Sequence, residues 1–291
     1  MKDFTVDNLT EEVIKAYQSQ TEDPRLRRIF GSMIQHLHNF VKDVELTEGE
    51  WFKAIEFLTA TGKQCDDKRQ EFILLSDTLG VSMLVDAINH PKGGAGTEST
   101  VLGPFYVPDA PSMPFGGDIR RRRLDHAEPC LVRGTVTDAA GGPLAAATVD
   151  VWQTSANGKY DVQDDAAPEW NLRGRFITQD DGSFALITEK PVSYSVPNDG
   201  PVGELLRAAG RHAYRPAHLH FMVSADGYEP LTTHIFVEGD PYLDSDAVFA
   251  TKASLVGNFE NCEDAGLARE FDLQTPFSSL EFDFGLMPLK N

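Results

Sequence analysis

The hydrophobic pattern of the chain changes its period about a third of the way along, and this change constrains the fold more than any other feature. Between residues 10 and 90 apolar side chains recur at three- and four-residue steps, as in Leu26, Ile29, Phe30, Met33, Leu37, Val41 and Val44. From Cys130 onward, short segments alternate with a period of two. A period near 3.6 is typical of helices and a period of two is typical of strands. The sequence therefore predicts an α+β protein with a helical N-terminal part.

Local signals separate the helices and mark where they end. Residues 47–50 read TEGE, a capping-box pattern in which two side chains each satisfy a backbone N–H at a helix start. Gly80 interrupts a later helical pattern, and residues 90–100, HPKGGAGTEST, have the glycine and proline content of a linker. We expect a helical N-terminal domain over residues 1–99 and a β-sandwich domain over residues 100–291.

Six short alternating segments in the second part predict strands. They cover residues 131–138, 147–154, 175–179, 183–188, 218–224 and 233–239. Strands of this length and spacing are typical of a sandwich, and residues 134–153 resemble the prealbumin type. Residues 180–182 read DDG between two of the segments and predict a hairpin turn. We therefore expect a prealbumin-like antiparallel β-sandwich.

The composition argues against several classes of function. The chain has 26 basic and 45 acidic side chains, which gives a net charge of −19 at pH 7. This charge repels nucleic acid and anionic membranes, so neither is an expected partner. No apolar run approaches the roughly 18 residues of a membrane span, and the N-terminal segment lacks an apolar signal region. Cys65, Cys130 and Cys262 form no CxxC pair, which indicates free thiols and a cytoplasmic protein.

The stretch RPAHLHFMV contains a candidate metal site. His218 and His220 share one face of a predicted strand, about 7 Å apart along the chain. This pattern is typical of two ligands that bind one metal ion. It also fits two polar residues on a sheet face that bind no metal. Tyr160 and Tyr194 lie in predicted loops. A tyrosine ligand must lose a proton with an ordinary pKa near 10, which a strongly polarising cation such as Fe³⁺ favours at neutral pH.

Five longer motifs extend this pattern over most of the chain. They read LGPFYVPDAP, VDVWQTSANGKYD, RGRFITQDDGSF, YRPAHLHFMVSADGYEPLTTHIF and GDPYLDSDAVF. With these motifs in this order, the chain resembles the intradiol ring-cleaving dioxygenases, non-haem Fe³⁺ enzymes that open catechols between the two hydroxyl-bearing carbons. The resemblance implies Tyr160 and His218 as equatorial ligands and Tyr194 and His220 as axial ligands. It also implies that Tyr194 leaves the metal and takes a proton from the substrate.

The resemblance further implies a substrate pocket. The residues expected to approach the substrate ring are Leu74, Asp77, Val101 and Leu102. Arg215 is expected over the ring, where it would stabilise developing negative charge. His234, within TTHIF, stands where catechol-specific members have glutamine, and together with LSDTLG it resembles the hydroxyquinol 1,2-dioxygenase branch. We expect His234 to contribute to catalysis and substrate binding; a buried sheet residue is the alternative.

Asp77 is the reason to prefer hydroxyquinol (benzene-1,2,4-triol) as substrate. A buried carboxylate needs a hydrogen-bond partner, which a third ring hydroxyl would supply. The expected reaction joins hydroxyquinol and O2 to give 3-hydroxy-cis,cis-muconate or maleylacetate, in the degradation of aromatic compounds. A catechol or chlorocatechol 1,2-dioxygenase that gives cis,cis-muconate is the alternative within the class. A non-catalytic β-sandwich binding module is the alternative outside it.

The apolar stripe from Leu26 to Val44 is wider than one short helix needs. We expect this stripe to join two chains in a homodimer. The resemblance implies the same arrangement, with an apolar tunnel at the joint that can hold a phospholipid. Packing of the stripe on helices of its own chain is the alternative.

Overall fold

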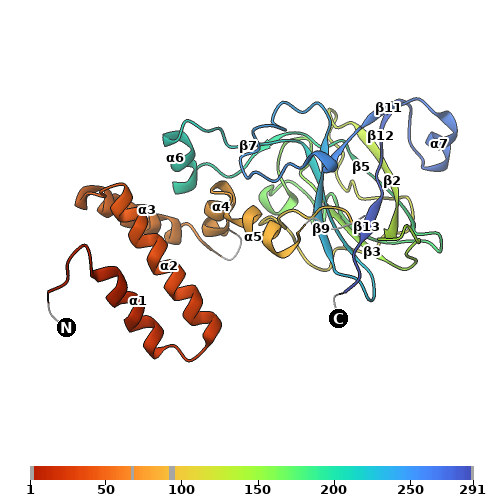
Figure 1. The fold of residues 1–291 in the computed structure, drawn as a ribbon. Helices are drawn as coiled ribbons and strands as arrows, with labels where there is room; N and C mark the ends of the chain where they lie inside the picture. Colours follow the sequence, from red (N-terminus) through yellow and green to blue (C-terminus); the bar gives the residue numbers. More distant parts are fainter. Residues whose placement is uncertain (1–2, 67–68, 92–95, 290–291) are drawn as a thin grey trace. The chain divides into compact units, whose positions relative to one another are not determined.

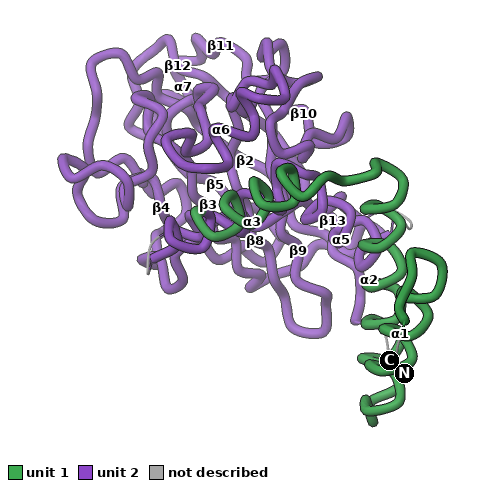
Figure 2. Tube along the Cα trace, turned by 90° about the vertical axis from the view of Figure 1, so that its left-hand side faces the viewer, with its two compact units in different colours: residues 1–60 green, residues 61–291 purple. Residues whose placement is uncertain are grey.

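The computed structural model describes residues 3–66, 69–91 and 96–289. The chain forms two compact units, residues 1–60 and residues 61–291, which Figure 2 distinguishes by colour. This division falls earlier than the domain boundary expected after residue 99, because the helices between the two positions contact the second unit: α4 (Glu71–Thr78) packs against α6 (Pro201–Ala208).

The first unit contains α1 (Leu9–Gln20), α2 (Pro24–Asp43) and most of α3 (Glu48–Lys63), and α1 packs along α2. The predicted capping box is confirmed at the start of α3. Glu50 accepts a hydrogen bond from the backbone N–H of Thr47, and Thr47 accepts one from the backbone N–H of Glu50. Together the two side chains satisfy N–H groups that a helix start leaves unpaired.

The predicted break at Gly80 is also confirmed. Gly80 has φ of 73°, a left-handed conformation that glycine adopts without strain, and it separates α4 from α5 (Val81–Asn89). The break therefore separates α5 from the last turn of α4, which carries Asp77.

Two sheets form the second unit (Figure 1). The six-stranded sheet has the order β1-β5-β2-β12-β11, with β13 also paired to β2; its strands are β1 (Gly117–Asp118), β2 (Pro129–Asp138), β5 (Ser183–Glu189), β11 (Glu260–Cys262), β12 (Phe277–Glu281) and β13 (Phe284–Leu286). The five-stranded sheet has the order β10-β9-β8-β3-β4; its strands are β3 (Thr148–Trp152), β4 (Arg173–Ile177), β8 (His218–Ser224), β9 (Leu231–Val237) and β10 (Val256–Gly257). The remaining elements are a small pair, β6 (Tyr194–Ser195) with β7 (Tyr214–Arg215), the 3-10 turns η1 (Asp161–Gln163) and η2 (Ala253–Leu255), and α7 (Ala265–Glu270).

The sandwich is confirmed, but its pairing is mixed rather than wholly antiparallel. β3, β4, β8 and β9 pair antiparallel, whereas β1, β10, β12 and β13 each join a neighbour in parallel. Each of these four strands is far in the sequence from the strand that it pairs with in parallel, and a long intervening chain allows either direction, whereas a short hairpin allows only antiparallel pairing.

The hairpin predicted at residues 180–182 is wrong. A turn does form there, but β4 and β5, which flank it, belong to different sheets, so the turn carries the chain from one sheet to the other. A period of two shows that a segment is a strand with one buried face. It does not show which strand is the partner, so the same pattern fits a hairpin within one sheet and a turn that connects two sheets.

The core between the sheets determines which face of β8 is free for chemistry. The ring of Phe221 lies 4.9 Å from the ring of Phe284 on the other sheet, so Phe221 points into the core. Because successive strand side chains point to opposite faces, His218 and His220 lie on the outer face of the five-stranded sheet. They are nevertheless buried, because other parts of the chain cover this face.

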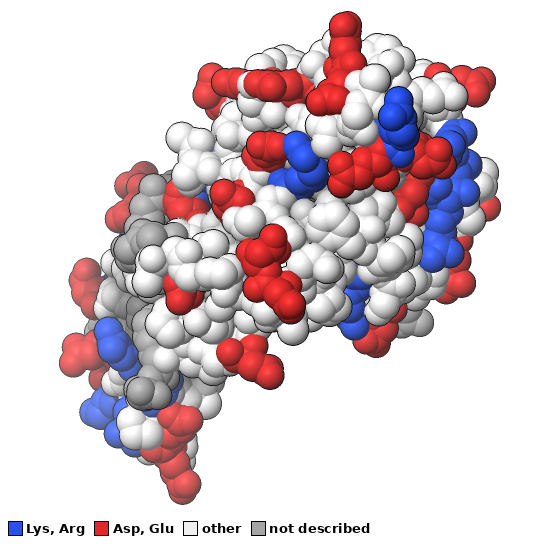
Figure 3. Space-filling model, turned by 90° about the vertical axis from the view of Figure 1, so that its right-hand side faces the viewer, with Lys and Arg blue, Asp and Glu red and all other residues white. Residues whose placement is uncertain are grey.

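Charged side chains on the surface agree with the acidic composition. Figure 3 shows acidic groups scattered over one face, with basic groups in small clusters among them rather than in one positive surface. Within the described ranges, no helix is both long enough and apolar enough to cross a bilayer.

Candidate metal centre

Four side chains from three separate segments bring their ligand atoms together. The phenol oxygens of Tyr160 and Tyr194 lie 3.0 Å apart, and the Tyr160 oxygen lies 2.7 Å from Nε2 of His220. The Nε2 atoms of His218 and His220 are 3.2 Å apart. All four residues are at least nine-tenths buried. The structure therefore assembles the four residues that the sequence suggested as metal ligands.

The local structure of each segment explains this convergence. Tyr160 lies directly before η1, in an extended loop conformation, as expected. Tyr194 is not in a loop: it begins the short strand β6, where it pairs with Arg215 of β7. Sequence reasoning missed this strand because two residues are too few to show a period.

The four rings contact one another in a closed circuit. Ring centroids are 5.7 Å apart for Tyr160 and Tyr194, and 5.5 Å apart for Tyr194 and His218. The circuit closes through His220, 4.8 Å from His218 and 5.9 Å from Tyr160. The four side chains thus enclose one small volume, and the two phenol oxygens and two Nε2 atoms face it.

Hydrogen bonds indicate which nitrogen of each histidine is available as a ligand. Nδ1 of His218 lies 2.6 Å from the carbonyl of Pro216, so it carries the proton and donates. Nε2 of His220 lies 2.7 Å from the phenol oxygen of Tyr160, and it has a free lone pair on this side when the ring carries its proton on Nδ1. Two nitrogen lone pairs and two phenol oxygens therefore face one small volume. This donor set suits a hard, highly charged cation such as iron.

Burial favours the neutral forms of Tyr160, His218 and His220. Burial, and after it the positive charge of Arg215, lowers the pKa of His218 to about 3. Burial, and after it the charge of His218, lowers the pKa of His220 well below its usual value. Burial, and after it the neighbouring Tyr194, raises the pKa of Tyr160 well above 10. A phenolate at Tyr160 therefore needs a strong positive charge beside it.

Arg215 supplies a fixed positive charge next to these residues. Its Nη1 lies 3.2 Å from Nε2 of His218, and its Nε lies 3.1 Å from a carboxylate oxygen of Asp246. Burial is the largest influence and opposes the charge of Arg215, but Asp246, together with Tyr194 and Tyr160, outweighs burial and raises the pKa of the guanidinium. Asp246 lies in the motif GDPYLDSDAVF, but no local pattern in that motif predicts its pairing with Arg215, which only the fold brings about.

His234 completes a cluster of three histidines. Nitrogen atoms of His218, His220 and His234 lie within 4.8 Å of one another. The ring of His234 contacts those of the other two histidines and of Phe236, and its Nδ1 lies 2.6 Å from the hydroxyl of Thr100. His234 was expected near the site, on a strand that follows β8 through a hairpin, and the structure places it there.

A cavity of about 830 Å³ opens beside Tyr194. Among the residues expected around the substrate, Leu74 lines this cavity. Asp77 does not line it: the side chain is 4% exposed, and burial raises its pKa although Ser82 and Arg215 lower it. Val101 and Leu102 do not line the cavity either, and Leu102 is 40% exposed.

The contacts of three further residues, Trp152, Phe105 and Arg173, were not predicted. The indole of Trp152 stacks on His220 at 4.7 Å, and Phe105 stacks on Tyr160 at 4.6 Å. Arg173 pairs with Asp161 at 2.7 Å, and its guanidinium carbon lies 5.9 Å from the centre of the Tyr160 ring. The alternation of the VDVWQ segment places Trp152 on a sheet face, but nothing in the sequence shows which ring it covers.

Both parts of the chain match known families. Residues 101–288 match the family described as Dioxygenase, and residues 23–97 match the one described as Catechol dioxygenase N terminus. The chain is 50% identical over 286 residues to the hydroxyquinol 1,2-dioxygenase of Rhizobium sp. (strain MTP-10005), which is 97% of this chain and 96% of that protein. It is 49% identical to the 6-chlorohydroxyquinol 1,2-dioxygenase of Cupriavidus pinatubonensis, over 94% of this chain and 98% of that protein.

A solved structure agrees with these matches. The structure of hydroxyquinol 1,2-dioxygenase from Pseudomonas putida DLL-E4 aligns with a TM-score of 0.90 at 48% identity. The alignment covers 98% of this chain and 99% of that one. The similarity therefore includes the helices as well as the two sheets.

Proposed function

Because this chain belongs to the intradiol ring-cleavage dioxygenases, a family that depends on iron, we propose that it is a hydroxyquinol 1,2-dioxygenase with Fe³⁺ as its cofactor. The ligands in this proposal are Tyr160, Tyr194, His218 and His220. The observation that carries it is the convergence of two phenol oxygens and two imidazole nitrogens inside the protein, with neighbouring atoms 2.7 to 3.2 Å apart. The names of the relatives at 49–50% identity support the substrate.

The charges around the site fit a trivalent cation. Bound Fe³⁺ would supply a Lewis acid that holds both catecholic oxygens and withdraws electron density from the ring. Two phenolates and one further anion would balance its charge, so that the buried site is not left with an unpaired charge. The two histidines, neutral because burial lowers their pKa, add donors without adding charge.

Tyr194 is the tyrosine placed to exchange a proton with substrate. It lines the cavity of about 830 Å³, whereas Tyr160 does not line it and lies under the ring of Phe105. We assign to the Tyr194 oxygen the role of accepting a proton from a substrate hydroxyl. Tyr160 then has the role of a permanent ligand.

Arg215 is placed to stabilise negative charge on the substrate ring. Asp246 holds its guanidinium from one side, so the cation is positioned before the reaction begins. Charge that is already oriented in a buried site stabilises a transition state more than mobile charge in water does.

Asp77 supports hydroxyquinol over catechol in this proposal. A buried carboxylate near Arg215 could accept a hydrogen bond from the third ring hydroxyl, which catechol lacks. Leu74 would provide an apolar wall of the cavity beside Tyr194, whereas Asp77 does not line that cavity and its contact with the third hydroxyl stays a prediction. The roles of Val101 and Leu102 at the ring stay predictions, as does direct contact of His234 with substrate.

We also propose that the enzyme is a homodimer that works in the cytoplasm. One side of α2 exposes large apolar side chains; they are Leu26, Ile29, Met33, Leu37, Phe40, Val41 and Val44. Such a stripe supports association with a second chain, and a phospholipid bound at the joint would cover more of it. The free thiols of Cys65, Cys130 and Cys262 support a reducing compartment.

Oxygen uptake and colour test this function together. The purified, iron-loaded protein should be red, because phenolate-to-Fe³⁺ charge transfer absorbs visible light, and should consume O2 with hydroxyquinol much faster than with catechol. A coloured enzyme that prefers catechol would contradict the substrate. A colourless protein that takes up no iron would contradict the metal centre and favour a binding module.

A further inference from the structure

His220 and His234 face each other across two paired strands. Their Cα positions are directly opposite in the register of β8 and β9, which places both side chains on the same face of the sheet. The ring centroids are 4.2 Å apart, and the ring planes make an angle of 69°. Both rings are almost completely buried. Each ring nitrogen therefore needs a partner inside the protein.

One ring nitrogen of His220 and one of His234 have no hydrogen-bond partner in the described structure. Nε2 of His220 is paired with Tyr160, and Nδ1 of His234 is paired with Thr100. Nδ1 of His220 and Nε2 of His234 are buried and have no hydrogen-bond partner in the part of the chain that the structure describes. His218 differs, because its Nδ1 reaches the carbonyl of Pro216. His220 thus lacks the backbone acceptor that orients the other histidine.

The neighbouring indole cannot supply the missing acceptor. Trp152 stacks on His220, and its Nε1 is also buried without a partner in the described structure. An indole N–H can only donate. When Nε2 of His220 faces the other metal ligands, the ring carries its proton on Nδ1. That nitrogen, like the indole N–H of Trp152, must therefore donate a hydrogen bond. Nε2 of His234 can accept, provided that His234 carries its own proton on Nδ1 and gives it to the oxygen of Thr100.

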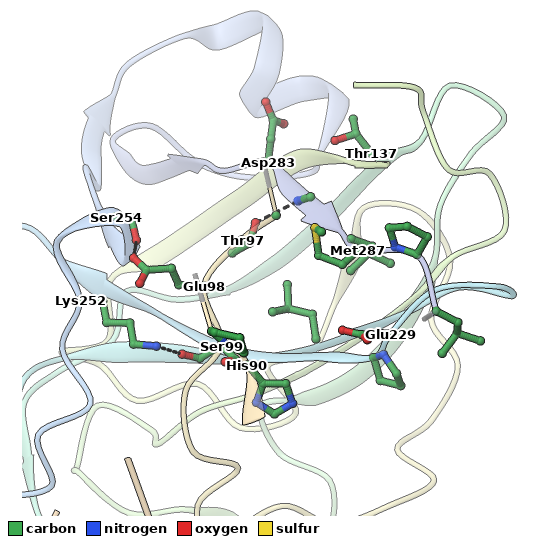
Figure 4. Close-up of a pocket in the computed structure, with 18 of the residues that line it drawn as sticks. His90, Thr97, Glu98, Ser99, Thr137, Glu229, Lys252, Ser254, Asp283 and Met287 are labelled. Atoms are coloured by element: carbon green, nitrogen blue, oxygen red, sulfur yellow. Dashed lines mark hydrogen bonds between the residues drawn. The ribbon is translucent and has the colours of Figure 1, made fainter. Parts of the chain in front are cut away.

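The backbone of Thr100 is anchored, which fixes the position of its hydroxyl beside Nδ1 of His234. The backbone N–H of Thr100 donates to the carbonyl of Thr232 at 2.8 Å. The residues just before it are fixed as well (Figure 4): Lys252 donates to the carbonyl of Ser99 at 2.5 Å, and Thr97 accepts from the backbone N–H of Gly285 at 2.9 Å. The hydroxyl of Thr100 therefore starts from an anchored backbone.

We propose that Thr100 and His234 are positioning residues: Thr100 holds His234 so that, when iron is bound, its Nε2 accepts the Nδ1–H of the ligand His220, a bond that these two nitrogens do not make in the described structure. The inference rests on the metal centre proposed above. Hydrogen bonding at the outer nitrogen of a metal-bound histidine fixes the ring and raises its basicity, and loss of such a partner typically weakens metal binding about 10- to 100-fold. His234 thereby acts on the iron through His220, separately from any contact with substrate.

Iron retention and the visible spectrum test this proposal without measuring turnover. We expect His234→Leu to lose iron to a chelator about 10 to 100 times faster than wild type, with a shifted visible band. His234→Gln keeps an acceptor oxygen and should remain close to wild type. Thr100→Val should fall between wild type and His234→Leu, and Thr100→Ser should restore retention.

A matched substitution separates this role from general packing. Thr233 is buried on the same strand as His234, and its hydroxyl donates to the carbonyl of Glu98, so Thr233→Val removes a similar bond away from His220. We expect it to keep wild-type iron retention. The double variant Thr100→Val/His234→Leu should match His234→Leu alone, because Thr100 acts only through His234.

Several results would overturn the proposal. One is a folded His234→Leu with the spectrum and iron retention of wild type. Another is a His234→Gln that loses iron as fast as His234→Leu, which would remove the acceptor role. If His234→Leu does not fold, equal iron loss in Thr100→Val and Thr233→Val would count against the inference in the same way. Failure of wild type to take up iron would contradict the metal centre itself, so the two failures can be distinguished.

Discussion

The phenol oxygens of Tyr160 and Tyr194 lie 3.0 Å apart, although 34 positions separate the two residues in the chain. Their surroundings differ: Tyr194 lines the cavity of about 830 Å³, and Tyr160 is stacked against Phe105 outside its lining. Two chemically identical side chains therefore have different access to a substrate. This asymmetry supports the different roles proposed for the two tyrosines, and substitution can separate those roles.

Replacing each tyrosine by phenylalanine should separate binding of the metal from proton exchange. We expect Tyr160→Phe to lose most of its iron and its visible band. Tyr194→Phe should keep more iron but lower kcat about 100-fold or more, as expected for loss of a group that accepts a proton. Metal analysis, absorption spectra and oxygen uptake measure these effects. Tyr242→Phe, whose ring contacts His212 and Tyr214 rather than either ligand, serves as the control. Full iron content and unchanged colour in Tyr160→Phe would remove that residue from the site.

Substituting Asp77 should change the choice of substrate. Without the carboxylate, the third hydroxyl of hydroxyquinol loses a hydrogen bond, at a cost of about 1–3 kcal/mol. We expect Asp77→Leu to lower the ratio of kcat/KM for hydroxyquinol to that for catechol by about 5- to 150-fold. Asp86→Asn changes another buried carboxylate, paired with His90 and Lys252 rather than placed near Arg215, and should leave the ratio unchanged. An unchanged ratio in Asp77→Leu would assign Asp77 a structural role only.

The same residue should affect stability in a pH-dependent way. Burial raises the pKa of Asp77 in the folded protein, so the native state holds this proton more tightly than the unfolded chain does. The stability contributed by the proton is therefore present below the unfolded pKa and is lost as pH rises through the folded one. Asparagine at this position cannot ionise, so Asp77→Asn does not lose this stability as pH rises. In urea unfolding of the metal-free protein, the variant should gain stability over wild type as pH rises, and then level off. A difference that does not vary with pH would contradict this.

Breaking the Arg215–Asp246 pair should be costly. Both side chains are buried, and both carboxylate oxygens of Asp246 bond to the guanidinium. Removing one partner of a buried pair typically costs about 3–5 kcal/mol, because the other charge is left uncompensated. We expect that loss for Asp246→Asn, measured by urea unfolding of the metal-free protein, together with reduced kcat. Asp199→Asn disrupts an exposed ion pair with Arg69 and should cost less than about 1 kcal/mol. Equal effects of the two substitutions would contradict the proposed importance of the buried pair.

Charge placed on the apolar stripe of α2 should separate the chains of the proposed dimer. Leu37 and Phe40 are each 55% exposed. A glutamate at either position would have to be buried without a partner in a joint made by this stripe. Leu37→Glu and Phe40→Glu should therefore be monomeric at micromolar concentration in light scattering, while Gln35→Glu on the same helix remains a dimer. A monomeric wild type would refute the dimer directly.

The sequence by itself determined the classes of structure and the chemical candidates. The change of period separated helices from strands because each period follows from the geometry of one backbone conformation. The HxH spacing determined that His218 and His220 share a face, because alternation along a strand is a local property. The capping box at Thr47 and Glu50 and the break at Gly80 were predictable for the same reason: each depends on a few adjacent residues.

Only the tertiary structure decided which distant residues meet. Three contacts illustrate this: the pairing of Arg215 with Asp246, the stacking of Trp152 on His220, and the hydrogen bond between Thr100 and His234. The residues of each pair are between 31 and 134 positions apart, and no local pattern specifies that they meet. The turn at residues 180–182 shows the same limit, because two strands with the same alternation can pair or lie in opposite sheets. Alternation records that one side of a strand is buried. The partner depends on how the whole chain packs, because the free energy of burying an apolar face is nearly independent of which surface covers it.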